Sequence, residues 1–143
     1  MTHRCIFHLS VPVADLNAAE QFHTTVLGAR IGRRAPDWID ALVWGHQITL
    51  QLRPQEVLPL DQQGKRHFGV VLPWQDWVAL VERLDTARTK VLAPAEVRLA
   101  GTPAEQAKLY LEDPSHNVIE IKAYRNPQQT IGVGDSSYAY TDV

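Results

Sequence analysis

Two histidines and one glutamate have the residue types and the placement needed to bind a metal ion. His8 and His67 lie in segments that otherwise have strand character, and Glu120 lies between Ile119 and Ile121. A polar side chain among core-facing residues costs free energy unless it is paired or bound to something. Two histidines and one carboxylate, with coordination positions left open, form the ligand set of non-haem Fe(II) oxygenases. We therefore predict one divalent metal ion on these three side chains, with Fe(II) favoured and Mn, Ni, Co or Zn as alternatives.

Each of these residues also has a plain structural interpretation. A single histidine is more often a hydrogen-bonded core or surface residue than a ligand. Glu120 alone would more often be a strand residue that faces solvent. The metal hypothesis depends on the repeat that places all three in matching elements of two similar modules.

The two halves of the chain repeat the same order of predicted strands and helices. In the first half, strand-forming residues at 5–13 precede a helix that Asp15 or Asn17 can cap and Gly28 can end. Further strands are predicted at 29–33, 38–44 and 47–53. After a loop at 55–65 the pattern restarts, with a strand at 66–73, a helix at 74–88 and strands at 90–98, 106–112 and 118–124. Both halves are therefore predicted to be βαβββ modules.

Composition excludes several classes of protein. The chain has 143 residues, 45% of them hydrophobic, and a formal net charge of -2, so no basic field favours nucleic acid or a membrane. No segment has the length or the apolar character of a signal peptide or a membrane span. A single cysteine, Cys5, fits a reducing cytoplasm. We expect one domain over residues 1–125, with modules at about 4–53 and 66–125, and a polar C-terminal tail at 126–143.

The motifs resemble those of the vicinal oxygen chelate superfamily, which includes glyoxalase I, extradiol dioxygenases, methylmalonyl-CoA epimerase, and fosfomycin and bleomycin resistance proteins. The similarity covers roughly residues 7–124, and its most specific part is DPSHNVIEI at 113–121, with His116 where glycine is usual. The other segments that carry it are HLSVPVADL at 8–16, the stretch from Phe22 to VLG at 26–28, and HFGVV at 67–71. More narrowly, WID at 38–40, GHQ at 45–47 and EIKAYR at 120–125 resemble small proteins predicted to be extradiol-type dioxygenases.

Gln51 and Asp40 separate the reactions that this resemblance implies. Glyoxalase I-like members usually have a carboxylate at the position of Gln51, whereas extradiol dioxygenases need no ligand there. Methylmalonyl-CoA epimerase has a glutamine there as a fourth ligand and a carboxylate base near the position of Asp40. Gln51 is therefore a possible fourth ligand or a hydrogen-bonding neighbour of the site, and both residues also fit a purely structural role as polar residues that line the barrel.

Four further residues are candidates for the surroundings of the metal. His46 in a predicted turn and Tyr124 on the strand face of Glu120 are candidate acid/base or hydrogen-bonding residues. Trp38 and Tyr110 are candidate walls of a substrate pocket, with core packing as the alternative.

These observations predict an α+β fold, in which two tandem βαβββ modules form an open mixed β-barrel around one metal site. The favoured function is cleavage of a catechol-like ring with O₂, in which the metal binds two adjacent substrate oxygens. The alternatives are an epimerase or glyoxalase-type isomerase or lyase, in which the metal stabilises an enediolate, and a non-catalytic binder of a small molecule such as an antibiotic. The resemblance further implies a homodimer.

Overall fold

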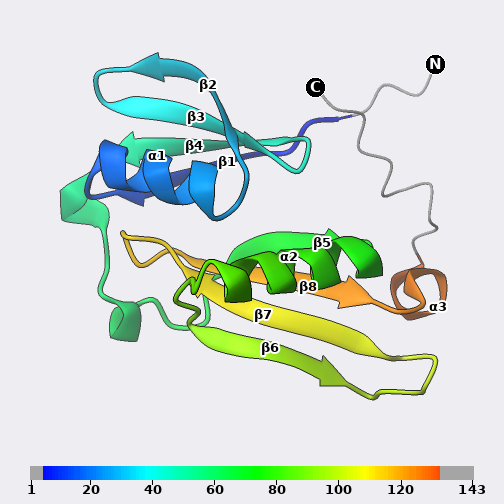
Figure 1. Ribbon diagram of the computed structural model, residues 1–143. Helices are drawn as coiled ribbons and strands as arrows, with labels where there is room; N and C mark the ends of the chain where they lie inside the picture. The colour runs from blue at the N-terminus through cyan, green and yellow to red at the C-terminus, as the bar shows by residue number, and fades with distance from the viewer. Residues whose placement is uncertain (1–4, 133–143) are drawn as a thin grey trace. The chain divides into compact units, whose positions relative to one another are not determined.

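The computed structural model describes residues 5–132 and divides them into two compact units. The first unit comprises residues 5–64 together with the turn 113–117, and the second comprises 65–112 and 118–132. Each unit contains one four-stranded mixed sheet and one main helix in the order βαβββ (Figure 1). The prediction of an α+β fold with two tandem modules is confirmed, and each sheet is open.

The first sheet has the strand order β1-β4-β3-β2. Strand β1 runs parallel to β4, and the other two pairs are antiparallel. The β2–β3 pairing shifts its register between Ile31 and Arg34, as a β-bulge does. The elements of this unit are β1 (His8–Val13), α1 (Leu16–Thr25), β2 (Arg30–Ala35), β3 (Trp38–Val43), β4 (His46–Leu52) and two short 3-10 helices at Pro54–Glu56 and Leu60–Gln62.

Helix α1 begins at a side-chain cap. The Asp15 carboxylate accepts a hydrogen bond of 2.8 Å from the backbone N–H of Ala18, so Asp15 rather than Asn17 is the capping residue. Gly28 has a φ of 72°, which glycine adopts without the steric cost that a Cβ would add, and the chain turns there into β2. Helix α1 packs on β3 and β4 and so covers one face of the sheet.

The two faces of the first sheet differ in polarity because side chains alternate along each strand. The face that includes Ile39, Ala41, Ile48 and Leu50 is buried. Alternation places a polar set on the opposite face, formed by His8, Ser10, Asp40, Gln47, Thr49 and Gln51. This polar face contains three candidate site residues of the first module, His8, Asp40 and Gln51.

The second sheet repeats the arrangement with the order β5-β8-β7-β6, and β5 runs parallel to β8. Its buried face is formed by alternate residues of β7 and β8: Ala107, Leu109, Leu111, Ile119, Ile121 and Ala123. Helix α2 packs on β8, and the Trp77 indole N–H donates to the carbonyl oxygen of Ile121 at 3.2 Å. The elements are β5 (Phe68–Leu72), α2 (Trp74–Thr86), β6 (Ala93–Arg98), β7 (Gln106–Glu112), β8 (Val118–Tyr124) and α3 (Pro127–Ile131).

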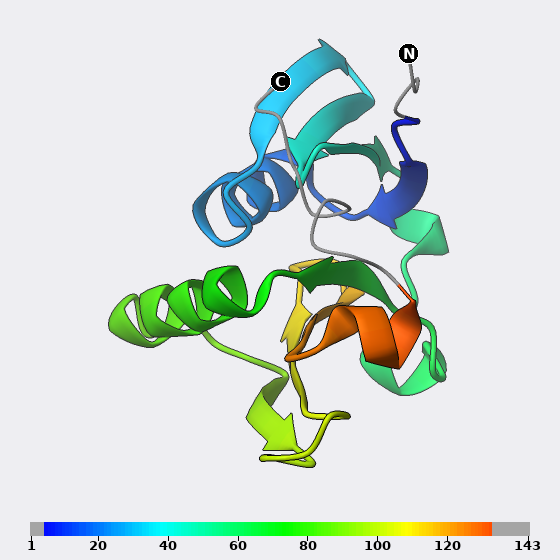
Figure 2. The ribbon, with the colours of Figure 1, turned by 90° about the vertical axis from the view of Figure 1, so that its right-hand side faces the viewer.

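Two sequence-based placements need correction. The predicted strand at 66–73 begins only at Phe68, so His67 lies one residue before β5 and not within it. The segment at 126–143, predicted as a polar tail, begins with the short helix α3, which Asn126 caps and which contacts β8 (Figure 2). Residues 133–143 of that tail lie outside the described part of the chain. No helix among the described residues is long and apolar enough to span a membrane.

The turn 113–117 belongs to the first unit because its polar groups bond to that unit. The buried Asp113 carboxylate accepts hydrogen bonds of 2.8 Å from the backbone N–H groups of Ser115 and Asn117. Asn117 donates to the carbonyl of Pro12 at 3.1 Å, and the Ser115 hydroxyl accepts from the N–H of Ala14 at 2.9 Å. The motif that carried much of the family resemblance is therefore a hydrogen-bonded connector at the end of β1.

His23 on the buried side of α1 gives this unit a pH dependence. Its Nδ1 bonds to the Ala19 carbonyl at 2.8 Å, and its Nε2 has no hydrogen-bond partner among the described residues. Burial lowers the pKa of His23 below its ordinary 6.5, although the Ala19 carbonyl and the Asp113 charge act in the opposite direction. Below pH 6.5 the unfolded chain therefore binds a proton that the folded chain does not.

We expect the free energy of unfolding to fall as the pH drops below 6.5, until the pH reaches the lower pKa of the folded state. One such proton contributes a slope of up to about 1.4 kcal/mol per pH unit. His23→Leu should remove this contribution and leave stability at pH 8 nearly unchanged. Urea unfolding of both proteins at several pH values from about 5 to about 8 would measure this slope. An identical pH profile for the two proteins would contradict the assignment to His23.

Candidate metal site

The second unit brings two of the three predicted ligands together. The Nε2 atom of His67 lies 3.1 Å from Oε2 of Glu120. His67 precedes β5, and Glu120 lies on β8, which is paired with β5. The carboxylate side chain is only 12% exposed, whereas the imidazole is 40% exposed. A solute can therefore approach this pair from the side of His67.

The bonding of His67 determines what can lie between these two atoms. Its Nδ1 lies 2.8 Å from the carbonyl oxygen of Lys65, and a carbonyl can only accept, so Nδ1 carries the hydrogen. In the neutral imidazole Nε2 then presents a lone pair to a carboxylate oxygen. Two acceptors at 3.1 Å repel each other unless a proton or a cation is shared between them.

A divalent cation fits this pair. Two ligand atoms at about 2.1 Å from one metal and about 90° apart lie about 3.0 Å from each other. The separation between His67 Nε2 and Glu120 Oε2 is 3.1 Å. An imidazole that donates its other N–H to a backbone carbonyl is also the usual arrangement of a metal-binding histidine.

Tyr110 holds the other oxygen of the glutamate. Its hydroxyl donates to Oε1 of Glu120 at 2.6 Å, and its ring makes an edge contact with His67. The hydrogen bond to Glu120 and, next, burial raise the pKa of Tyr110 to about 12, so the hydroxyl keeps its proton at neutral pH. Tyr110, proposed from sequence as a pocket wall, therefore also orients a predicted ligand.

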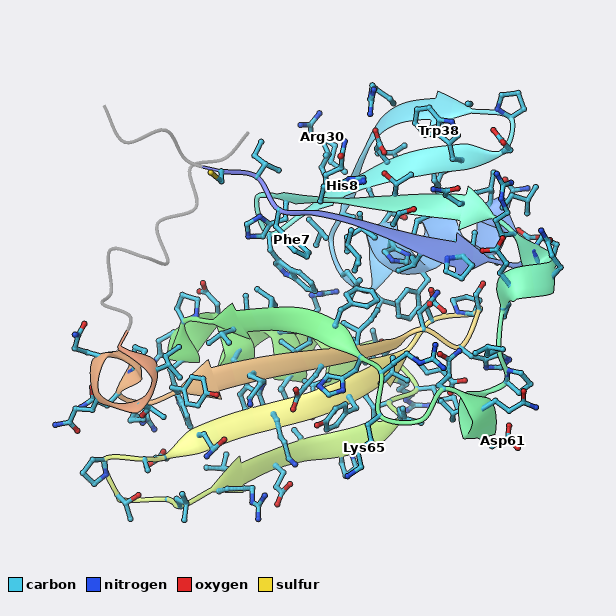
Figure 3. All side chains as sticks on the ribbon, turned by 180° about the vertical axis from the view of Figure 1, so that it is seen from behind. Phe7, His8, Arg30, Trp38, Asp61 and Lys65 are labelled. Atoms are coloured by element: carbon cyan, nitrogen blue, oxygen red, sulfur yellow. The ribbon has the colours of Figure 1, made fainter. Side chains whose placement is uncertain are left out.

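The third predicted ligand, His8, belongs to the first unit. It is the exposed first residue of β1, and its Nδ1 lies 2.7 Å from Oε1 of Gln47 on β4 (Figure 3). Among residues 5–132 no cluster of three His, Cys, Asp or Glu side chains is close enough to hold a metal. The structure thus joins His67 with Glu120, and the completion of the site by His8 stays a prediction.

Gln51 and Asp40, which separate the alternative reactions, have different surroundings. The Gln51 amide donates to the hydroxyl of Ser10 at 2.6 Å on the polar face of the first sheet. Asp40 is 1% exposed and accepts from Thr49 Oγ1 at 2.6 Å, from Arg33 Nε at 3.0 Å and from the Gln47 amide at 3.1 Å. Both carboxylate oxygens of Asp40 are engaged in these bonds.

The three remaining predicted site residues, His46, Trp38 and Tyr124, make other contacts within their own units. The Nδ1 atom of His46 accepts the backbone N–H of Phe7 at 3.1 Å, which joins the start of β1 to the β3–β4 hairpin. Trp38 lies on β3, where the Arg33 guanidinium is 5.4 Å from the centre of its ring. Tyr124 ends β8, and the Lys122 ammonium lies 5.4 Å from its ring centre.

The groups that hold the two histidines were not predicted from the sequence. The Lys65 carbonyl is a backbone group and has no side-chain signal. Gln47 did have a side-chain signal, because a period of two along β4 places it on the same face as Thr49 and Gln51. The parallel register of the structure then places Gln47 directly opposite His8.

Comparison with known proteins identifies the class. The family model described as the Glyoxalase/Bleomycin resistance protein/Dioxygenase superfamily matches residues 6–121. A crystal structure of a glyoxalase/bleomycin resistance protein/dioxygenase from Alicyclobacillus acidocaldarius is 27% identical, with a TM-score of 0.76, and the match covers 92% of this chain and 99% of the other. No curated protein matches the chain.

Two structures with different activities share the fold. The fosfomycin resistance protein FosX from Listeria monocytogenes is 16% identical, with a TM-score of 0.66 and coverage of 85% of this chain and 94% of the other. Lactoylglutathione lyase from Agrobacterium tumefaciens is 18% identical, with a TM-score of 0.59 and coverage of 83% and 92%. The chain therefore belongs to the glyoxalase, bleomycin resistance and dioxygenase superfamily, that of the vicinal oxygen chelate fold, whose members include enzymes with different reactions.

Proposed function

We propose that the chain is a metal-dependent enzyme that cleaves a catechol-like ring with O₂, and that His8, His67 and Glu120 bind its metal, with Fe(II) favoured. The observation that carries the metal part is the pair of facing acceptors, His67 Nε2 and Glu120 Oε2. A carboxylate kept 12% exposed opposite an imidazole lone pair needs a cation or a proton between the two acceptors, and a divalent cation fits their separation.

The surroundings of Asp40 support ring cleavage over proton transfer. An epimerase of the kind considered above needs Asp40 as a base, yet both oxygens of this buried carboxylate accept hydrogen bonds from the protein itself. It also needs the carbonyl oxygen of Gln51 on the metal, which the bond from the Gln51 NH₂ group to Ser10 does not prevent. A ligand set of two histidines and one carboxylate leaves open positions for two adjacent substrate oxygens and O₂.

The protein residues have separable roles in this proposal. When bound, the metal supplies a Lewis acid that lowers the pKa of a coordinated hydroxyl. Tyr110 donates to Glu120 and holds the carboxylate in one orientation. Trp38 and Tyr110 offer aromatic surfaces for a planar substrate. Tyr124 and His46 are the candidates to accept the proton of the second substrate hydroxyl, and His46 would first have to release the N–H of Phe7 from Nδ1.

Gln51→Ala separates the two reactions. If ring cleavage is correct, the variant should retain the metal affinity of the wild type within about twofold, because its amide is not a ligand. The Fe(II)-loaded wild-type protein should consume O₂ with at least one member of a catechol panel, measured with an oxygen electrode. Gln21→Ala on the exposed side of α1 is the matched control.

The isomerase or lyase alternative makes the opposite predictions. Gln51→Ala would then weaken metal binding strongly, and Asp40→Asn would abolish exchange of a solvent proton into a 2-acyl thioester or a hydroxyketone. The absence of O₂ uptake across the panel, together with such proton exchange, would replace ring cleavage by this alternative. A wild-type protein that binds a small molecule but no metal would favour the third class, a non-catalytic binder.

Two further proposals concern the setting of the enzyme, the first from the family resemblance and the second from the single cysteine. We propose that it acts as a homodimer, which sedimentation of the purified protein would test. We propose that it works in the cytoplasm, where the exposed free thiol of Cys5 would stay reduced.

A further inference from the structure

A continuous hydrogen-bond path joins a buried carboxylate to His8 on the polar face of the first sheet. Asp40 on β3 accepts from Nε2 of Gln47 at 3.1 Å, and Oε1 of the same amide lies 2.7 Å from Nδ1 of His8. Gln47 on β4 lies directly opposite His8 in the parallel register, so the strand pairing itself brings the two together. Neither Gln47 nor this path has a role in the proposed reaction.

The far end of the path fixes the orientation of the amide. The Arg33 guanidinium lies 3.0 Å from Oδ2 of Asp40, and the Thr49 hydroxyl lies 2.6 Å from Oδ1. A carboxylate whose oxygens face a guanidinium and a hydroxyl accepts hydrogen bonds from both. The group of Gln47 that faces Asp40 must therefore be the NH₂ donor. Its carbonyl oxygen then necessarily faces His8.

The amide oxygen in turn fixes the tautomer of His8. Because Oε1 of Gln47 can only accept, Nδ1 of His8 carries the hydrogen, and Nε2 of the neutral ring carries the lone pair. In the second module the Lys65 carbonyl, 2.8 Å from Nδ1 of His67, produces the same tautomer. The two modules reach one result with different acceptors, a side-chain amide in the first and a backbone carbonyl in the second.

We propose that Gln47, oriented by Asp40, is a positioning residue that holds His8 with its hydrogen on Nδ1 and so presents Nε2 to the metal. This inference rests on the proposed function, in which His8 is a ligand. It also gives Asp40 a role that requires its burial. The carboxylate anchors the amide, and Arg33 and Thr49 hold the carboxylate in place.

The test begins with the metal-free protein, where the tautomer can be observed directly. Long-range ¹H–¹⁵N correlation spectra at about pH 8 distinguish the protonated from the unprotonated ring nitrogen, and His8→Gln assigns the His8 signals. The wild type should show His8 protonated on Nδ1. Gln47→Met, which keeps the length of the side chain and removes both hydrogen-bonding groups, should shift His8 towards the form protonated on Nε2.

The second measurement is the affinity for Zn(II) or Co(II), followed by titration calorimetry. Gln47→Met should weaken it about 10- to 100-fold, as expected when a partner of a ligating histidine is lost. Gln21→Met on the exposed side of α1 should change neither the tautomer nor the affinity. Asp40→Asn, which removes the acceptor-only anchor, should change both in the same direction as Gln47→Met.

Each result decides one of the two claims. A wild-type His8 protonated on Nε2, or a Gln47→Met protein whose tautomer or metal affinity equals that of the wild type, would overturn the role of Gln47. A wild-type protein that binds no divalent cation, or that binds it equally well after His8→Ala, would instead overturn the proposed ligand set. The spectra of the metal-free protein still report on Gln47 in that case.

Discussion

Glu120→Gln should abolish metal binding and at the same time stabilise the metal-free protein. Loss of the hydrogen-bonding partner of a metal ligand can lower metal affinity by roughly 100-fold. Loss of the charged ligand itself should lower it further. In the metal-free wild type, the lone pair of His67 Nε2 lies 3.1 Å from a carboxylate oxygen. A glutamine can present its NH₂ group to that lone pair while its carbonyl still accepts the hydroxyl of Tyr110.

The gain in stability should be about 1 kcal/mol, the usual net contribution of one hydrogen bond. Metal content after dialysis and urea unfolding of the metal-free proteins would measure the two effects. Glu96→Gln on β6, where the native carboxylate contacts Lys108 and Arg98, is the matched control and should retain the metal.

His67→Ala provides an independent comparison because it removes the ligand without offering a new hydrogen bond. It should lose the metal as Glu120→Gln does, and its gain in stability should be smaller, because it relieves the facing lone pairs without adding a hydrogen bond. Full metal occupancy in either variant would contradict the ligand set. A Glu120→Gln protein that loses the metal and is also less stable would show that the facing lone pairs are not the source of strain in the metal-free site.

The elements of this fold could be predicted from sequence because the relevant signals are local. Alternation along 106–112 and 118–124 gave β7 and β8 with their observed bounds, and a period of three to four gave α2. The pairing of β1 with β4 and of β5 with β8 has no local signal. No strand pairing was therefore predicted from the sequence.

The site could be predicted less completely because its partners come from backbone groups and irregular geometry. No property of Lys65 as a side chain indicates that its carbonyl holds His67. The register shift in β2 between Ile31 and Arg34 lets Arg33 reach Asp40, and a bulge of this kind depends on the pairing of two strands. Asp40 was therefore recognised as a polar residue of interest, but its anchoring partners were not.

Gly69 illustrates a requirement that appears only once two strands are paired. It lies opposite Glu120 in the parallel register of β5 and β8. A Cβ at this position would overlap the backbone carbonyl of Glu120, 2.6 Å from its carbon atom. The obstacle is backbone, so no side-chain rotation can relieve the overlap, and the two strands would have to separate locally.

Gly69→Ala should therefore destabilise the protein by about 3 kcal/mol or more, at or above the upper end of the usual cost of overpacking. In molecules that still fold, the displaced backbone is that of Glu120 itself, so the affinity for a divalent cation should fall together with stability. Gly32→Ala is the matched control, because its Cβ would meet the Leu42 side chain at an ordinary 3.4 Å. It should change the free energy of unfolding by less than about 1 kcal/mol. Urea unfolding and metal titration of both variants would measure these effects. A Gly69→Ala protein with the stability and metal affinity of the wild type would contradict the close approach of β5 to Glu120.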